Sequence, residues 1–345
     1  MKVVVVGATG HIGTYLVPRL VIAGHEVVAI SRGHRGPYLE HRAWDEVERV
    51  QVDRDAEDAA GTFGSRVAAL RPEAVVDLMC FTVPSARQLL EALTPVGSYL
   101  LHCGTIWVHG SAVEVPVTED EARHPFGDYG VQKAAIEDLL LGAVRSGTLR
   151  GTVLRPGHIV GPGWAPVNPA GNLNVEVFNR LARGDELVLP NLGLETVHHV
   201  HADDVAQAFA RALSSPGAAS GQAFHIVSER ALTLRGYAES VAAWFGQTAR
   251  LSFQPWETWA AAWEPQDAQA TWDHIAHSPS MSMAKATASL GYGPRYSSLE
   301  AVFESLAWLV DHGQVDVPGR RLRRDIYPLR EPYQPQSTTG DVRLV

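Results

Sequence analysis

The sequence contains two cysteines and no long hydrophobic run, and both features restrict what the protein can be. Cys80 and Cys103 are too few for a disulfide framework, which is typical of a reducing compartment. No window reaches the ~18 consecutive apolar residues of a membrane-spanning helix, since Pro18 and Arg19 interrupt the stretch LVPRLVIAG. The valines near the N-terminus lead into a glycine rather than into a signal-peptide cleavage site. We therefore expect a cytoplasmic protein with no membrane partner.

Basic residues are outnumbered by acidic ones. Lys and Arg total 29 and Asp and Glu total 38, which gives a net charge of −9. A chain with this charge is poorly suited to capture nucleic acid by overall attraction, so we expect no nucleic-acid partner and only local binding of phosphate. Hydrophobic residues make up 46% and charged residues 19% of the 345 positions, which excludes a disordered chain.

Short apolar runs rich in valine and leucine recur along the first half of the chain, and each precedes a segment long enough for a helix. Continuous rather than alternating hydrophobicity is typical of strands covered on both faces. The sequence therefore predicts an α/β fold: a Rossmann doubly wound parallel sheet with a smaller C-terminal α/β substrate lobe. The expected strands cover 2–6, 26–30, 74–79, 98–102 and 151–155, with a weaker strand at 49–52.

A glycine-rich turn follows the first expected strand. Gly7, Gly10 and Gly13 stand between that strand and an apolar-periodic helix. In this context glycines let the backbone approach a pyrophosphate, whose charge is stabilised by the amides and dipole of the helix. The sequence predicts a dinucleotide site here. The other candidate contacts in the turn are Thr9, His11 and Ile12.

The regularity of the chain falls after about residue 157, where Gly, Pro and Asn dominate. We expect a dinucleotide-binding domain at 1–157 to which later segments can return, a mainly substrate-binding lobe at 158–316, and an extended tail at 317–345. The elements expected in the lobe are helices at 173–183, 202–214, 233–245 and 298–312, and strands at 187–189, 197–200 and 223–227.

The choice of nicotinamide cofactor depends on the end of the second expected strand. An acidic residue there would favour NAD, but this chain has Ser31 and Arg32. Arg32, with His34 and Arg35 behind it, offers cations suited to a 2′-phosphate, although such residues can also be ordinary surface charges. The sequence thus favours NADP and leaves NAD possible. Asp53, after the weak third strand, could accept from the adenine amino group or form a turn.

Three residues form a candidate proton-handling site. Tyr129 and Lys133 are four apart on an expected helix, 128–146, so they share one face. An ammonium near a phenol favours the phenolate, so we expect the Tyr129 pKa to be lowered from about 10 toward the range of a general acid or base. Thr105 follows a strong strand, which places it at the sheet edge where open α/β folds bind ligands.

Several motifs in order resemble the extended short-chain dehydrogenase/reductase family, in its NAD-dependent epimerase/dehydratase branch. They are GATGHIG, the strand leading into HCGTIWVHG, VTEDEARHPFGDYGVQKAAIE, LRPGHIVGPG and HVHADDVAQAF, and the resemblance covers about residues 1–312. It implies a seven-stranded sheet, an NAD(P)-dependent enzyme acting on a carbohydrate-like small molecule, and a homodimer. By this resemblance the catalytic residues are Thr105, Tyr129 as acid/base and its supporting Lys133, and the cofactor-binding glycines are Gly7, Gly10 and Gly13.

One position departs from the nucleotide-sugar epimerases of that family. Where they carry an arginine that grips the substrate diphosphate, this chain has Val197. We therefore expect hydride transfer on a sugar or sugar-like alcohol, with epimerisation and net oxidation or reduction both open. One alternative is a nucleotide-sugar 4-epimerase whose clamp is displaced to Arg180, Arg183 or Arg295. Another is a non-catalytic, RNA-associated or regulatory protein, since the SRGHRG loop is similar to chloroplast stem-loop RNA-binding proteins.

The three histidines near residue 200 predict no metal site. His198 and His199 would point to opposite faces of a strand, and no Cys or carboxylate set is spaced to complete a site with His201.

The first testable prediction concerns Arg32. Replacing it with Asp should weaken NADP binding by about 1–3 kcal/mol, the range for a charge-assisted hydrogen bond, while NAD binding is spared. Calorimetric titration of both cofactors measures the effect. Equal affinities of the unaltered protein for NADP and NAD would contradict it.

Overall fold

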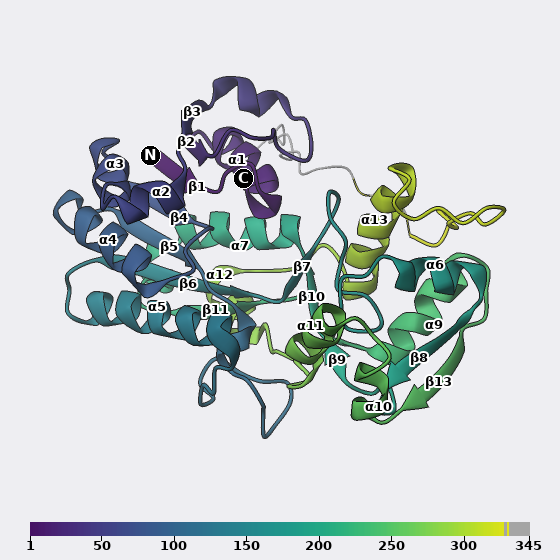
Figure 1. Ribbon diagram of the computed structural model, residues 1–345. Helices are drawn as coiled ribbons and strands as arrows, with labels where there is room; N and C mark the ends of the chain where they lie inside the picture. Colours follow the sequence, from purple (N-terminus) through teal and green to yellow (C-terminus); the bar gives the residue numbers. More distant parts are fainter. Residues whose placement is uncertain (328–329, 331–345) are drawn as a thin grey trace, which may run out of the picture.

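A seven-stranded parallel sheet forms the centre of the structure, a computed structural model that describes residues 1–327 and Arg330 (Figure 1). The strand order is β11-β6-β5-β4-β1-β2-β3, and every neighbouring pair is parallel. This confirms the predicted doubly wound Rossmann fold. The strands are β1 (Lys2–Val6), β2 (Glu26–Ser31), β3 (Glu48–Gln51), β4 (Ala74–Asp77), β5 (Tyr99–Cys103), β6 (Arg150–Pro156) and β11 (Ala223–Ile226).

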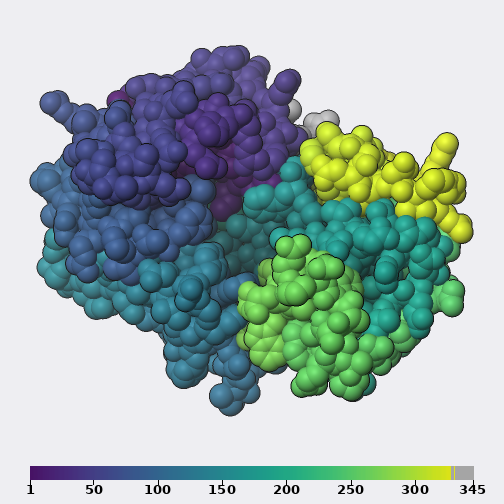
Figure 2. All heavy atoms as spheres, viewed as in Figure 1, coloured from purple at the N-terminus to yellow at the C-terminus, as the bar shows by residue number. Residues whose placement is uncertain are grey.

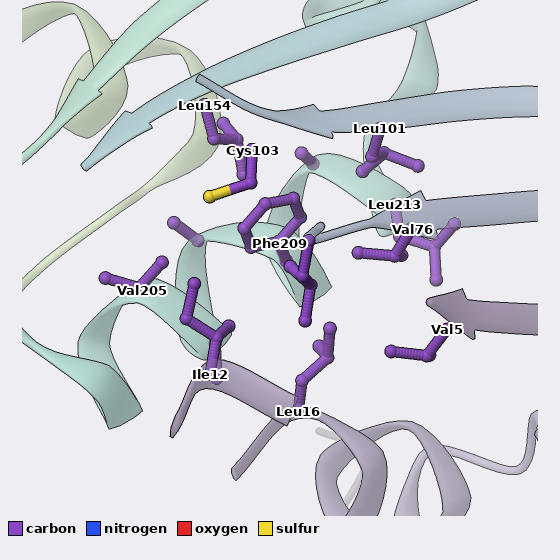
Figure 3. Packing of buried hydrophobic residues seen from close by; sticks show 14 of the residues in the cluster. Val5, Ile12, Leu16, Val76, Leu101, Cys103, Leu154, Val205, Phe209 and Leu213 are labelled. Atoms are coloured by element: carbon purple, nitrogen blue, oxygen red, sulfur yellow. The ribbon is translucent and has the colours of Figure 1, made fainter. Parts of the chain in front are cut away.

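Helices cover both faces of this sheet, and the run of valines in β1 explains why. Val3 and Val5 pack on one face, and Val4 and Val6 pack on the other. Because alternate strand residues point to opposite faces, a strand between two helical layers must be apolar throughout. One layer contains α1 (His11–Ile22), α7 (Ala202–Ser214), α8 (Pro216–Ala219) and α12 (Ala284–Leu290), part of which is seen in Figure 3, and the other contains α3 (Phe63–Ala69), α4 (Val83–Leu93) and α5 (Gly127–Arg145).

Most of the chain beyond β6 packs around a second hydrophobic core. It packs helices around the parallel pair β8 (Glu186–Pro190) and β13 (Arg250–Gln254). Two further small pairings are β7 (His158–Val160) with β10 (His199–His201) and β9 (Thr196–Val197) with β12 (Leu232–Thr233). The helices of this core are α6 (Glu176–Arg183), α9 (Leu234–Trp244), α10 (Trp256–Ala260), α11 (Pro265–Ile275) and α13 (Ser298–Asp311).

The structure corrects three expectations about individual elements. The strand expected at 197–200 is divided because β9 pairs with β12, whereas β10 pairs with β7, and the His198 ring between them contacts the Ser228 carbonyl and the Met281 amide. The helix expected at 173–183 begins only at Glu176. Residues 223–226, expected in the lobe, form β11 and complete the large sheet beside β6.

The beginning of the expected tail packs on the second core. Leu322 is buried there, and the Arg323 amide donates to the Trp244 carbonyl at 2.8 Å. Residues 328–329 and 331–345 of the expected tail lie outside the described residues. Within the described part of the chain, no helix is both long and apolar enough to cross a membrane.

A second testable prediction concerns the packing of α1 on the glycine turn. A Cβ at Gly13 would lie 2.1 Å from the Ala8 carbonyl oxygen, so Gly13→Ala forces the helix and turn apart. We expect the free energy of unfolding to fall by about 1–3 kcal/mol. Gly142→Ala in α5 is the matched control, because the nearest atom to that Cβ is Arg145 Nη2 at 3.8 Å. Urea unfolding of the two variants with equal midpoints would contradict the prediction.

Candidate functional site

The carboxyl ends of the parallel strands meet at one edge of the sheet. This edge brings together the glycine turn after β1, Ser31 at the end of β2, Thr105 after β5 and His158 after β6. The space-filling view is hollowed where the N-terminal half, purple to blue, meets segments drawn in teal and green (Figure 2). Ligands of open α/β sheets bind at this edge.

The glycine turn leaves the first turn of α1 open to an anion. Gly7 has φ +83°, and a Cβ there would lie 2.4 Å from Met79 Cγ, so a larger residue would not fit. Gly10 is the N-cap of α1 and supplies no side-chain cap, and no acidic residue stands in the first turn. Free amides and the helix dipole therefore favour a bound phosphate here.

The other predicted residues of this turn differ in what they can contact. The Ile12 side chain is buried in the core between α1 and the sheet, so only its backbone is available to a ligand (Figure 3). His11 is 5% exposed, and neither ring nitrogen has a hydrogen-bond partner among the described residues. Its ring packs against Tyr38 and Trp164. Burial, aided by the charge of Arg35, lowers the pKa of His11 to about 3, so the ring is neutral near pH 7.

The residues expected to bind the adenosine part of the cofactor also differ in how available they are to a ligand. Arg32 is exposed, and its carbonyl accepts from Gln51 Nε2 at 3.0 Å. Arg35 lies over the Tyr38 ring, and burial together with the nearby Arg32 lowers the pKa of its guanidinium. Asp53 caps α2 (Arg54–Ala59): its Oδ1 accepts from the amides of Asp55 and Ala56, so this oxygen already serves the turn.

Thr105, Tyr129 and Lys133 are brought together as the sequence predicts. The Thr105 hydroxyl accepts from the Trp107 amide at 3.3 Å, and it lies near enough to the Tyr129 phenol to lower the pKa of that group. Lys133 is 2% exposed, and its Nζ donates to the Cys103 carbonyl at 2.7 Å. One turn of α5 therefore carries a phenol and an ammonium to the end of β5.

The expected lowering of the Tyr129 pKa is not observed. Desolvation raises the pKa of this phenol even though Tyr129 is 41% exposed, and the nearby Thr105 hydroxyl only partly opposes the rise. The Lys133 ammonium lies 5.7 Å from the centre of the Tyr129 ring and is directed to Cys103 instead. Burial also lowers the pKa of Lys133. Near neutral pH the phenol is thus protonated.

Sequence reasoning missed residues beside this site. Trp107 packs edge-on against Tyr129, with ring centres 5.5 Å apart, and also contacts His274 and His277. His158 lies next to His274. The position of His158 at the end of β6, in LRPGHIV, was the available signal, whereas nothing near α11 in the sequence marked His274.

The structure also locates the residues considered for a diphosphate clamp. Val197 is fully buried in the second core. Arg183 pairs with Glu176 and Asp185, and Arg295 pairs with Asp203, while Arg180 lies exposed on α6. Within residues 1–327, no group of three or more His, Cys, Asp or Glu side chains is arranged to hold a metal ion.

Comparison with known proteins agrees with this geometry. Residues 3–226 match the family described as the NAD dependent epimerase/dehydratase family. The chain belongs to this family. The predicted membership of the extended short-chain dehydrogenase/reductases and the prediction of an enzyme are thereby confirmed.

Two curated relatives and one solved structure illustrate the range of this epimerase/dehydratase family. A 2′-dehydrokanamycin reductase from Streptomyces kanamyceticus is 29% identical over 322 residues, 91% of this chain and 86% of the relative. A chloroplast stem-loop binding protein from Arabidopsis thaliana is 26% identical over 70% of this chain and 62% of its own length. UDP-glucose 4-epimerase from Thermotoga maritima, solved with UDP-glucose, has a TM-score of 0.69 and 22% identity, covering 90% and 99% of the two chains, and so shares the fold.

A third prediction tests the acid/base assignment in this family member. Tyr129→Phe removes only the phenol oxygen, so turnover should fall roughly 10²–10⁴-fold while cofactor affinity is kept. Lys133→Met should weaken both, because the buried ammonium is also available to the nicotinamide ribose. Steady-state kinetics and cofactor titration of the two variants measure the effects. Full activity of Tyr129→Phe would exclude the assignment.

Proposed function

We propose that this protein is an NAD(P)-dependent oxidoreductase that reduces the ketone of a sugar or sugar-like compound, or oxidises the corresponding alcohol, with Tyr129 as the acid/base. The observation that carries the proposal is the meeting of Thr105, Tyr129 and Lys133 at the sheet edge that also bears the glycine turn. A proton donor and an anion-binding helix end are the two parts that such chemistry needs.

The residues present fit a nicotinamide dinucleotide, which when bound supplies or accepts the hydride. The close approach allowed at Gly7 and the uncapped first turn of α1 would hold its diphosphate. Arg32 and Arg35, neither with an ion-pair partner among the described residues, would receive a 2′-phosphate, which supports NADP over NAD.

Tyr129 would act as the proton donor in the reductive direction. The phenol is protonated near neutral pH, so it can give its proton to the carbonyl oxygen as that oxygen gains charge. Thr105 donates a second hydrogen bond to the same oxygen. The Lys133 ammonium, 5.7 Å from the centre of the Tyr129 ring, would favour the negative charge left on Tyr129 only through space, because its Nζ donates to the Cys103 carbonyl.

The arginine pairings support a substrate without a nucleotide. Val197 leaves no cation at the diphosphate position, and Arg183 and Arg295 are engaged with carboxylates. The relative named 2′-dehydrokanamycin reductase is named for a dehydro compound rather than for a UDP- or dTDP-linked sugar. The net charge of −9 opposes the RNA-associated alternative suggested by the stem-loop binding relative.

A fourth prediction follows for substrate choice. Loss of one charge-assisted contact is worth about 10–150-fold in affinity, so free sugars and aminoglycosides should be preferred to nucleotide sugars. The test is to follow NADP reduction with kanamycin and simple glycosides beside UDP-glucose, UDP-glucuronate and dTDP-glucose, with Tyr129→Phe as the control. Micromolar binding of a nucleotide sugar with turnover would restore the 4-epimerase alternative.

A further inference from the structure

Four histidines, three of them buried and His274 partly buried, lie close together near Trp107. This histidine cluster consists of His158 in β7, His199 in β10, His274 in α11 and His277 just after α11. The ring of His158 is 5.2 Å from that of His274 and 5.9 Å from that of His199, centre to centre. The cluster joins three segments that are distant in the sequence.

Trp107 connects the cluster to the proton-handling site. Its ring centre lies 5.5 Å from that of Tyr129, 5.6 Å from that of His274 and 6.0 Å from that of His277. Trp107 is therefore the neighbour that Tyr129 shares with His274 and His277.

Backbone contacts determine which ring nitrogens of His158 and His274 carry a proton. His158 Nδ1 accepts from the His198 amide at 3.2 Å, so its Nε2 bears the hydrogen. That Nε2 is buried without a partner among the described residues. His274 is the reverse: its Nδ1 donates to the carbonyls of Gly171 and Ala270, at 3.0 and 2.6 Å, which leaves its Nε2 as an acceptor. A donor and an acceptor thus stand side by side, too far apart to bond directly.

The other two histidines, His199 and His277, also have ring nitrogens without hydrogen-bond partners among the described residues. His199 Nε2 donates to the Val167 carbonyl at 3.0 Å, and its Nδ1 is a buried acceptor with no partner among the described residues. His277 is 7% exposed, and both of its ring nitrogens are buried and unpartnered within residues 1–327. A buried polar group without a hydrogen-bond partner lowers the stability of the protein. A ligand that hydrogen-bonded to these ring nitrogens would therefore be bound tightly.

The cluster carries no charge near neutral pH. Burial lowers the pKa of His277 to about 4 and that of His199 to about 3, and it lowers the pKa of His158 well below the usual histidine value. An anion needs donors or cations on every side, and here at least two nitrogens are acceptors. A hydroxyl both donates and accepts, and it can bridge His158 and His274.

We propose that the histidine cluster is a substrate subsite that recognises neighbouring hydroxyl groups of an uncharged sugar ring, and so sets the specificity of the enzyme. This inference rests on the proposed function for the position of the reacting carbon. In this proposal the substrate is recognised by hydrogen bonds with neutral histidine rings and not by ion pairs with a diphosphate.

The test is nitrogen NMR of the histidine rings in the full-length, cofactor-loaded protein. The probes are methyl glycosides of glucose, galactose, mannose and glucosamine, with inorganic phosphate and UDP-glucose as anionic comparisons. We expect at least one glycoside to shift His158 and His277 nitrogens without producing an imidazolium signal. The proposal is overturned if no glycoside shifts them, or if an anion binds and protonates them.

Variants separate recognition from folding. His277→Phe removes both hydrogen-bonding atoms and should weaken glycoside binding about 10-fold or more, while His277→Gln should retain part of it. His312→Phe is the matched control, because His312 is an exposed ring stacked on Trp308. Equal binding by the control and His277→Phe overturns the proposal. Because the titration of the unaltered protein needs no variant, a misfolded His277→Phe does not leave the question open.

The same measurements distinguish failure of this inference from failure of the proposed function. If a substrate supports hydride transfer but does not shift the nitrogen signals of the histidine cluster, the subsite proposal is wrong and the oxidoreductase function stands. Glycoside binding at the cluster without any Tyr129-dependent hydride transfer removes the oxidoreductase function and leaves a sugar-binding site.

Discussion

Because all neighbouring strands of the large sheet run parallel, their carboxyl ends meet at a single edge, and the whole candidate site depends on that arrangement. The glycine turn, Ser31 and Thr105 come from strands that are far apart in the chain but end at the same edge. Parallel pairing also requires crossover helices on both faces, and one of these, α5, carries Tyr129 and Lys133 to the end of β5. The same geometry that buries the strands therefore assembles the chemistry.

Buried ion pairs fix the helices that support this edge. Arg19 of α1 bonds Asp203 of α7 at 2.6 Å, and Arg295 bonds the other oxygen of that carboxylate, so the first core is tied to the segment before α13. On the opposite face, Glu137 lies one turn beyond Lys133 in α5 and pairs with Arg155 of β6. Removing the carboxylate of Asp203 or of Glu137 would take an ion-pair partner from a buried arginine, which is destabilising.

The candidate site combines neutral side chains in the region of the histidine cluster with positive charge at the dinucleotide end. The Tyr129 phenol is protonated near neutral pH because its pKa is raised, and burial keeps His158 and His277 of the histidine cluster neutral. Positive charge is left at the dinucleotide end, with Arg32 and Arg35, and at Lys133 beside the reacting centre. The proposed cofactor phosphate suits the arginines, and the proposed uncharged polyol suits the neutral histidine cluster.

The sequence by itself determined the parallel sheet, the glycine turn and the position of Tyr129 and Lys133 on the same face of one helix. These features depend on local periodicity and short spacings. It did not determine that the strand expected at 197–200 would be divided between two pairings, that β11 would complete the sheet, or that His201 would cap α7. Nor did it place His274 and His277 against Trp107, with His158 beside His274, or reveal that the pKa of the Tyr129 phenol is raised rather than lowered. These outcomes depend on contacts between distant segments and on the burial those contacts create, which only the tertiary structure decides.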